Sequence, residues 1–100
     1  MVKTAVSKNG MAIRLTDERW AHISEEHGEV SQLQSGILEA IRDPVRIVEG
    51  NAGELLAMRE LEVGKYIVVV YREGPNDGFV ITAFMTRRMR TLERRKQLWP

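Results

Sequence analysis

The sequence predicts an α+β fold. Two helices are expected on one face of an antiparallel sheet of about four strands, preceded by a short hairpin and followed by a basic C-terminal helix. In the first half of the chain, apolar residues recur at three- and four-residue spacing, which is typical of amphipathic helices. In the second half, β-branched and aromatic runs alternate with glycine-containing turns, which is typical of strands. Because helices and strands are segregated along the chain, an antiparallel sheet covered by helices is favoured.

A β-hairpin is expected at the N-terminus. Its strands are the short β-like runs Val2–Val6 and Met11–Leu15. The Asn9-Gly10 step between them favours a tight turn, because both residue types tolerate the left-handed backbone that such turns require.

The first helix is expected from about Asp17 to His27. Thr16 is a good N-cap, since its hydroxyl can accept a hydrogen bond from an amide of the first turn. Asp17 and Glu18 place negative charge where the helix dipole favours it, and Gly28 ends the helix.

A second helix is expected from about Val30 to Arg42, and Pro44 closes it, because the residue before a proline is biased away from helix. The periodic apolar positions that predict this helix are Val30, Leu33, Ile37, Ala40 and Ile41.

The following segment has the pattern of a strand meander. The expected strands are Val45–Glu49, Glu54–Glu62, Lys65–Arg72 and Phe79–Thr86. The third of these, K-Y-I-V-V-V-Y-R, is the clearest, because it is rich in β-branched and aromatic residues.

The C-terminal segment from Arg87 to Leu98 is expected to be a basic helix. Residues 87–100 carry a net charge of +5, whereas residues 1–86 carry −4. Such a concentration of positive charge suits a polyanion-binding surface, although the solvated face of a terminal helix would look the same. The basic residues are Arg87, Arg88, Arg90, Arg94, Arg95 and Lys96.

Length and composition indicate a single domain over residues 1–100. The chain has no cysteine, so thiol chemistry, disulfides and a zinc-finger framework are excluded. No apolar run is long enough to span a bilayer, and no signal-peptide pattern is present, so no membrane association and a cytoplasmic location are expected.

Both histidines fall on the first predicted helix, in different environments. His27 lies between Trp20 and Ile23 on the inner face, and His22 lies on the polar side. Their five-residue spacing disfavours a metal pair, so no metal is expected. His27 is either a group that titrates near neutrality or a capping residue on the last carbonyls of the helix, and the sequence leaves both interpretations open.

Several strand residues are further candidates. In the last strand, the set Phe79, Ile81, Ala83 and Met85 is the more uniformly apolar and is expected to face the helices. Thr82 and Thr86 would then lie on the open face of the sheet. Arg59 and Tyr71 are candidates from strand position alone, but a solvated charge and a core tyrosine are the ordinary interpretations.

Together these residues resemble a known family. The stretch L-T-D-E-R-W-A-H-I-S-E-E-H-G-E (Leu15–Glu29), the Asp43-Pro44 step, a strand with Arg59, and the strands K-Y-I-V-V-V and G-F-V-I-T-A-F-M-T resemble the phage-associated PBECR-like nuclease domains. These domains belong to the barnase, EndoU, colicin and RelE-like superfamily. The chain departs from the pattern at Gly28, where proline is often expected, and at Phe84, where tyrosine would supply a hydroxyl.

The resemblance implies a toxin-like, metal-independent ribonuclease without a cofactor. RNA would lie on the sheet, and its 2′-hydroxyl would attack the adjacent phosphodiester. By resemblance, His27, or His22 in its place, would be the acid or base, Arg59 would stabilise the phosphate, and Thr82 and Thr86 would position it. Tyr71 is added from its strand position, and the basic C-terminal helix would bind the flanking backbone.

Other functions fit the same residues. A catalytically silent RNA- or protein-binding domain of this fold is one alternative. A component of a toxin–antitoxin pair is another, and it would use Met89, Leu92 and Trp99 of the terminal helix as an apolar seam. An inhibitory protein partner and self-association as a homodimer are further hypotheses.

Overall fold

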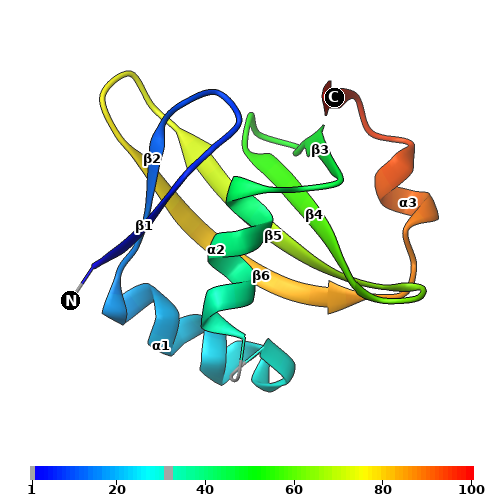
Figure 1. Ribbon diagram of the computed structural model, residues 1–100, viewed down its shortest axis with the longest axis horizontal. Helices are drawn as coiled ribbons and strands as arrows, with labels where there is room; N and C mark the ends of the chain where they lie inside the picture. Colours follow the sequence, from blue (N-terminus) through cyan, green and yellow to red (C-terminus); the bar gives the residue numbers. More distant parts are fainter. Residues whose placement is uncertain (1, 31–32) are drawn as a thin grey trace.

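The predicted sheet of about four antiparallel strands is wrong. The computed structural model describes residues 2–30 and 33–100, and it contains a seven-stranded mixed sheet (Figure 1). The strand order across the sheet is β1-β2-β6-β5-β4-β3-β7. The strands are β1 (Lys3–Val6), β2 (Ala12–Leu15), β3 (Arg46–Glu49), β4 (Leu55–Glu62), β5 (Lys65–Glu73), β6 (Gly78–Thr86) and β7 (Gln97–Trp99).

Two N-terminal helices are present, but the second begins at Gln34 rather than at about Val30, which lies in a separate 3-10 helix. Thr16 caps the first of them, because its side-chain oxygen accepts a hydrogen bond from the Arg19 amide at 3.1 Å. The second predicted helix included residues 31 and 32, which lie outside the described residues. The helices are α1 (Asp17–Glu26), the short 3-10 helix η1 (Gly28–Val30), α2 (Gln34–Arg42) and the single-turn α3 (Arg90–Glu93).

The N-terminal hairpin joins the main sheet, which local patterns could not reveal. β2 runs parallel to β6, with Ile13 opposite Gly78 and Arg14 opposite Phe79. Gly78 permits this approach, because a Cβ atom there would lie only 2.4 Å from the Ile13 Cδ1 atom. The mixed character of the sheet therefore depends on a contact between segments far apart in the sequence.

The predicted basic helix from Arg87 to Leu98 is also wrong. Only one helical turn forms, and the chain then continues as β7 along the free edge of β3. The Glu49 amide donates a hydrogen bond to the Lys96 carbonyl at 2.9 Å, and Trp99 packs against the core. Edge pairing and burial of this aromatic side chain override the helical propensity of the basic segment.

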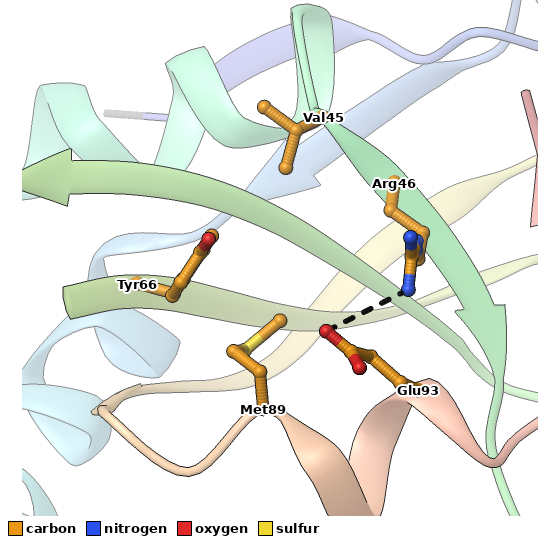
Figure 2. A pocket seen from close by; sticks show the side chains of 5 residues that line it. All are labelled: Val45, Arg46, Tyr66, Met89 and Glu93. Atoms are coloured by element: carbon orange, nitrogen blue, oxygen red, sulfur yellow. Dashed lines mark ion pairs between the residues drawn. The ribbon is translucent and has the colours of Figure 1, made fainter. Parts of the chain in front are cut away.

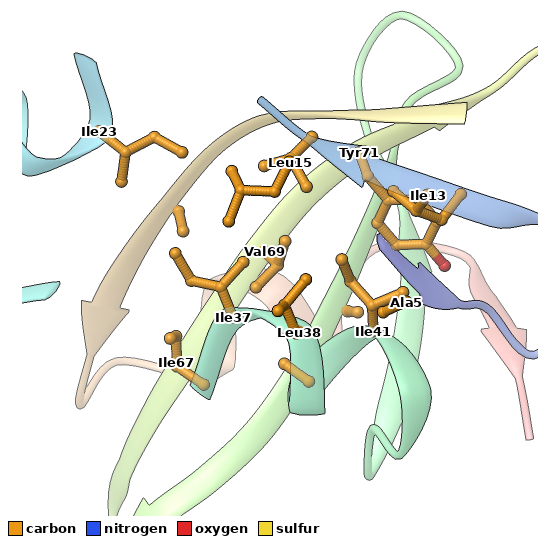
Figure 3. Packing of buried hydrophobic residues seen from close by; sticks show 14 of the residues in the cluster. Ala5, Ile13, Leu15, Ile23, Ile37, Leu38, Ile41, Ile67, Val69 and Tyr71 are labelled. Atoms are coloured by element: carbon orange, nitrogen blue, oxygen red, sulfur yellow. The ribbon is translucent and has the colours of Figure 1, made fainter. Parts of the chain in front are cut away.

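The larger core lies between the helices and one face of the sheet, and we call it the helix-side core. Ile37 and Ile41 of α2 are fully buried in it with Ile67 and Tyr71 of β5 (Figure 3). Burial of such side chains is the main source of stability in a domain of this size. The other fully or nearly fully buried members are Ala5, Ile13, Leu15, Ile23, Val30, Leu38, Ala40, Ile47, Ala57, Val69, Val80 and Ala83.

The opposite face of the sheet, which we call the α3-side face, carries a smaller core. Met89 and Leu92, in the segment that contains α3, pack against this core and are themselves partly buried. The seam expected for Met89, Leu92 and Trp99 is therefore not formed, because Trp99 packs against the helix-side core instead. The buried members of the smaller core are Val48, Leu56, Met58 and Val68.

The sheet is curved, so that its two outer parts approach each other. The Lys8 Nζ atom, in the turn between β1 and β2, lies 4.8 Å from the centre of the Trp99 ring in β7. α2 packs against β1, β4 and β5, within this curve. A curved sheet with helices on one side leaves the α3-side face as the less covered surface.

A bulge in β6 changes which residues face the helices. Val70 lies opposite Thr82 and Tyr71 opposite Val80, so Ile81 has no partner across the β5–β6 pair. Ala83 packs in the helix-side core as expected, but Val80 is also buried there and Phe79 is 40% exposed. The predicted inward position of Phe79 is wrong, because the extra residue at the bulge reverses the alternation beyond it.

Candidate functional site

The α3-side face offers polar side chains around its small apolar core. Tyr66 of β5 lies directly opposite Thr86 of β6, and Val68 lies opposite Phe84. Because side chains alternate along a strand, Thr82 shares this face with Phe84 and Thr86. The expectation that both threonines lie on the face away from α1 and α2 agrees with this register.

His27 reaches this face from the end of α1. Its backbone amide donates to the Ile23 carbonyl at 2.8 Å, so it occupies the C-cap position. Its ring centre lies 6.2 Å from that of Phe84, and a third of its side chain is exposed. The C-terminal half of β6 extends beyond its short pairing with β2, and α1 and η1 pack against β6. The imidazole can therefore lie at the border of the sheet face.

Glu29 of η1 lies beside the His27 ring. The Nδ1 atom lies 3.6 Å from a carboxylate oxygen of Glu29, which is half-exposed. His22, in contrast, is an exposed residue of α1. The two histidines therefore do not form one site.

Arg59 lies on the other side of the sheet from Thr82 and Thr86. It stands opposite Ile67, a residue of the helix-side core, and its guanidinium donates to the Asp43 carbonyl at 2.7 Å and to the Asp43 carboxylate at 3.2 Å. Asp43 is the C-cap of α2. Arg59 thus ties β4 to the end of α2, and the structure does not bring it together with the threonines.

Tyr71 is a core residue. Its side chain is fully buried, and its hydroxyl has no hydrogen-bond partner among the described residues. Burial raises the pKa of Tyr71, and the negative charge of Glu73 raises it further. This hydroxyl stays protonated and faces away from solvent, so it is not available to a bound RNA.

The basic C-terminal residues divide into paired and unpaired groups. Arg87 pairs with Glu62 at 3.0 Å, and Arg95 donates to the Asn51 side chain at 2.6 Å. The Arg88 amide donates to the Thr86 hydroxyl at 2.9 Å, which places this arginine directly after the polar end of β6. Among these C-terminal residues, the exposed basic side chains that contact no partner within residues 2–30 and 33–100 are Arg88, Arg90, Arg94 and Lys96.

A cavity of about 240 Å³ opens beside this polar end of the face (Figure 2). Figure 2 shows Tyr66 on one side of the space and the Arg46–Glu93 ion pair on the other. The sequence did not single out these residues, because both sides of the strand that contains Tyr66 are mostly apolar and alternation could not orient it. The lining residues are Val45, Arg46, Tyr66, Met89 and Glu93.

Outside the sheet face, one more carboxylate is perturbed. A hydrogen bond from the Ala52 amide lowers the pKa of Glu54, and the charges of Arg72 and Arg95 act in the same direction. This contact closes the turn between β3 and β4. The Glu54 carboxylate therefore has a structural role.

Neither a metal site nor a membrane span is found in the described part of the chain. Its histidines, aspartates and glutamates form no group of three that could hold a metal ion. None of its helices is both long and apolar enough to cross a bilayer.

Comparison with known proteins identifies no relative. No protein-family model, curated protein or solved structure matches the chain. The candidate site is therefore defined by its own geometry: an imidazole at the edge of a sheet face, two hydroxyls opposite each other on that face, and exposed arginines at the same end.

Proposed function

We propose that the chain is a metal-independent endoribonuclease of the PBECR-like type, with its active site on the α3-side face. The observation that supports this most directly is the position of His27 beside Phe84, on the strand that also carries Thr82 and Thr86. Arg59 and Tyr71 are not part of the proposed site, because one ties β4 to α2 and the other is buried in the helix-side core.

The proposed reaction is an internal transfer of the phosphate. The ribose 2′-oxygen attacks the adjacent phosphorus, the bond from phosphorus to the 5′-oxygen breaks, and the products are a 2′,3′-cyclic phosphate and a free 5′-hydroxyl. His27 takes the proton from the 2′-hydroxyl, and the Tyr66 hydroxyl supplies a proton to the leaving 5′-oxygen. Such positioned proton transfers accelerate reactions by roughly 10²–10⁴-fold each.

The remaining polar groups would hold the substrate. Thr86 lies opposite Tyr66, and its hydroxyl can donate to a phosphate oxygen while it accepts from the Arg88 amide. Arg88 and Arg90 are exposed and can contact phosphates on either side of the scissile bond. Binding through such contacts weakens as the salt concentration rises, because it releases counterions from the RNA.

The two histidines provide a matched test. We expect purified protein to cleave end-labelled RNA in the presence of EDTA, and His27→Ala to lower the cleavage rate by at least about 100-fold. His22→Ala removes the same side chain from an exposed position of the same helix, and it should leave the rate unchanged. Thermal unfolding of both variants would show that the fold is kept.

Equal rates for wild type and His27→Ala would contradict the proposed site. A specific observation favours one alternative function, which is RNA binding without cleavage: the α3-side face has an apolar centre, and Phe84 lacks the hydroxyl that the family pattern provides. Salt-sensitive RNA binding with no cleavage at any pH would support this alternative.

A further inference from the structure

The cavity beside Tyr66 combines an aromatic wall with two opposite charges. Tyr66 comes from β5, Arg46 is the first residue of β3 and Val45 directly precedes it, and Met89 and Glu93 come from the C-terminal segment (Figure 2). A volume of about 240 Å³ is large enough for one nucleobase. The tyrosine ring and the methionine thioether are surfaces on which the flat face of a base can stack.

The two charged groups keep their hydrogen-bonding capacity. An Arg46 nitrogen lies 4.0 Å from a Glu93 carboxylate oxygen, which is an ion pair but is longer than a hydrogen bond. Neither side chain hydrogen-bonds to another group in the part of the chain that the structure describes. A ligand can therefore bind both groups without breaking a hydrogen bond within the protein.

This arrangement is complementary to guanine. Arginine donates two parallel hydrogen bonds to the guanine O6 and N7 acceptors. The neighbouring edge of guanine presents N1–H and N2–H donors side by side, which match the two oxygens of a carboxylate. Because O6 lies between these two edges, an arginine and a glutamate a few ångströms apart can bind both edges of the same guanine at once. Adenine and cytosine instead present a lone pair at the ring nitrogen beside their amino group, which a carboxylate repels.

We infer that this cavity is a guanine-binding site and that, on the proposed function, it selects the nucleotide next to the cleaved bond. Tyr66 lies opposite Thr86, so a base in the cavity is adjacent to the hydroxyls proposed to hold the phosphate. The inference thus assigns a base preference to the proposed nuclease. Tyr66 takes part in both proposals, whereas Arg46 and Glu93 are not used by the cleavage step.

Nucleotide binding by the full chain tests the site without any cleavage. In an NMR titration of ¹⁵N-labelled protein, we expect GMP to shift the amides of the cavity residues and to bind about tenfold more tightly than AMP or CMP. Glu93→Gln should abolish this preference, because the amide cannot accept both guanine protons. Glu39→Gln, on the exposed side of α2 and also next to an arginine, is the matched control and should keep the preference.

A second binding experiment tests whether the guanine that binds in the cavity is part of an RNA or is a free nucleotide. A GpU dinucleotide with 2′-O-methyl groups cannot be cleaved. GMP already carries a phosphate, so the second nucleoside of GpU should make the dinucleotide bind more tightly than GMP if the ligand is RNA. Equal affinities would overturn RNA as the source. Equal binding of GMP and AMP, or amide shifts confined to other residues, would overturn the guanine site.

The outcomes also separate this inference from the proposed nuclease activity. Cleavage that depends on His27 but shows no base preference, together with no GMP selectivity, overturns the guanine site alone. Selective GMP binding in a protein that does not cleave RNA overturns the nuclease proposal alone.

Discussion

The two faces of the sheet differ in how completely they are covered. The helix-side core buries whole side chains from two helices and most strands, and even Tyr71 lies there without access to water. The α3-side face has a much smaller core, against which the partly buried Met89 and Leu92 of the C-terminal segment pack. The helix side of this sheet therefore provides most of the stability, whereas the α3-side face keeps polar groups accessible around an apolar centre. For this reason we propose the active site on the α3-side face.

The largest expected effect is on the helix-side core. Ile37→Ala should lower the free energy of unfolding by about 3–4 kcal/mol, because a fully buried side chain leaves a cavity. Leu92→Ala should lower it by only about 1 kcal/mol, since that side chain is partly exposed. Urea unfolding followed by circular dichroism measures both. Equal losses would contradict the proposed difference between the faces.

A smaller effect is expected where the helix side is joined to the sheet. Arg59→Ala should lower the free energy of unfolding by about 1 kcal/mol, because it removes two hydrogen bonds to Asp43 at a partly exposed site. The matched control is Arg42→Ala, which removes an exposed contact to Glu39 and should change stability by less than about 0.5 kcal/mol.

The same variants distinguish a structural from a catalytic Arg59. RNA cleavage by Arg59→Ala at a temperature where the fold is intact should equal that of the wild type. If Arg59→Ala keeps its fold but loses as much cleavage activity as His27→Ala, Arg59 takes part in catalysis.

The smallest effect concerns the buried hydroxyl of the helix-side core. Tyr71→Phe should raise the free energy of unfolding by about 0.5–1 kcal/mol, because it removes a buried hydroxyl that has no partner among the described residues. Chemical denaturation at neutral pH measures the change. A loss of stability would show that the hydroxyl has a favourable contact.

The pH dependence of this variant gives a second measurement. Burial raises the pKa of Tyr71 in the folded state above its ordinary value of 10.0. Above about pH 10 the unfolded chain loses this proton while the folded chain keeps it, so the stability of the wild type falls as the pH rises further. Tyr71→Phe should lack this part of the decline. Parallel curves for the two proteins between pH 9 and 11 would contradict the raised pKa.

The features that the sequence predicted correctly are those decided within a few residues. The Asn9-Gly10 turn, the Thr16 cap and the β-branched run that begins at Lys65 each depend on local backbone preferences. The parallel β2–β6 pair and β7 depend on Gly78 and Trp99 meeting distant partners, so propensity alone could not give them. Tertiary contacts decided both.

The candidate site was predictable only in part, for a related reason. His27 and the threonines were found because a helix end and a polar alternation mark them in the sequence. Tyr66 was missed and Tyr71 was chosen, since the strand between them is apolar on both sides and is buried on both faces. Arg46 and Glu93 are far apart in the sequence, and they form an ion pair because the C-terminal segment folds back beside β3.

The order of the strands also determines which strand pairings have the largest cost in loop-closure entropy. β4, β5 and β6 pair with their neighbours in sequence, so their loops are short and closing them costs little. The hairpin formed by β1 and β2, and the C-terminal strand β7, are added through pairings between distant segments. Contact order is therefore low in the middle of this sheet and high at its two edges, and the edges limit how fast all seven strands can assemble.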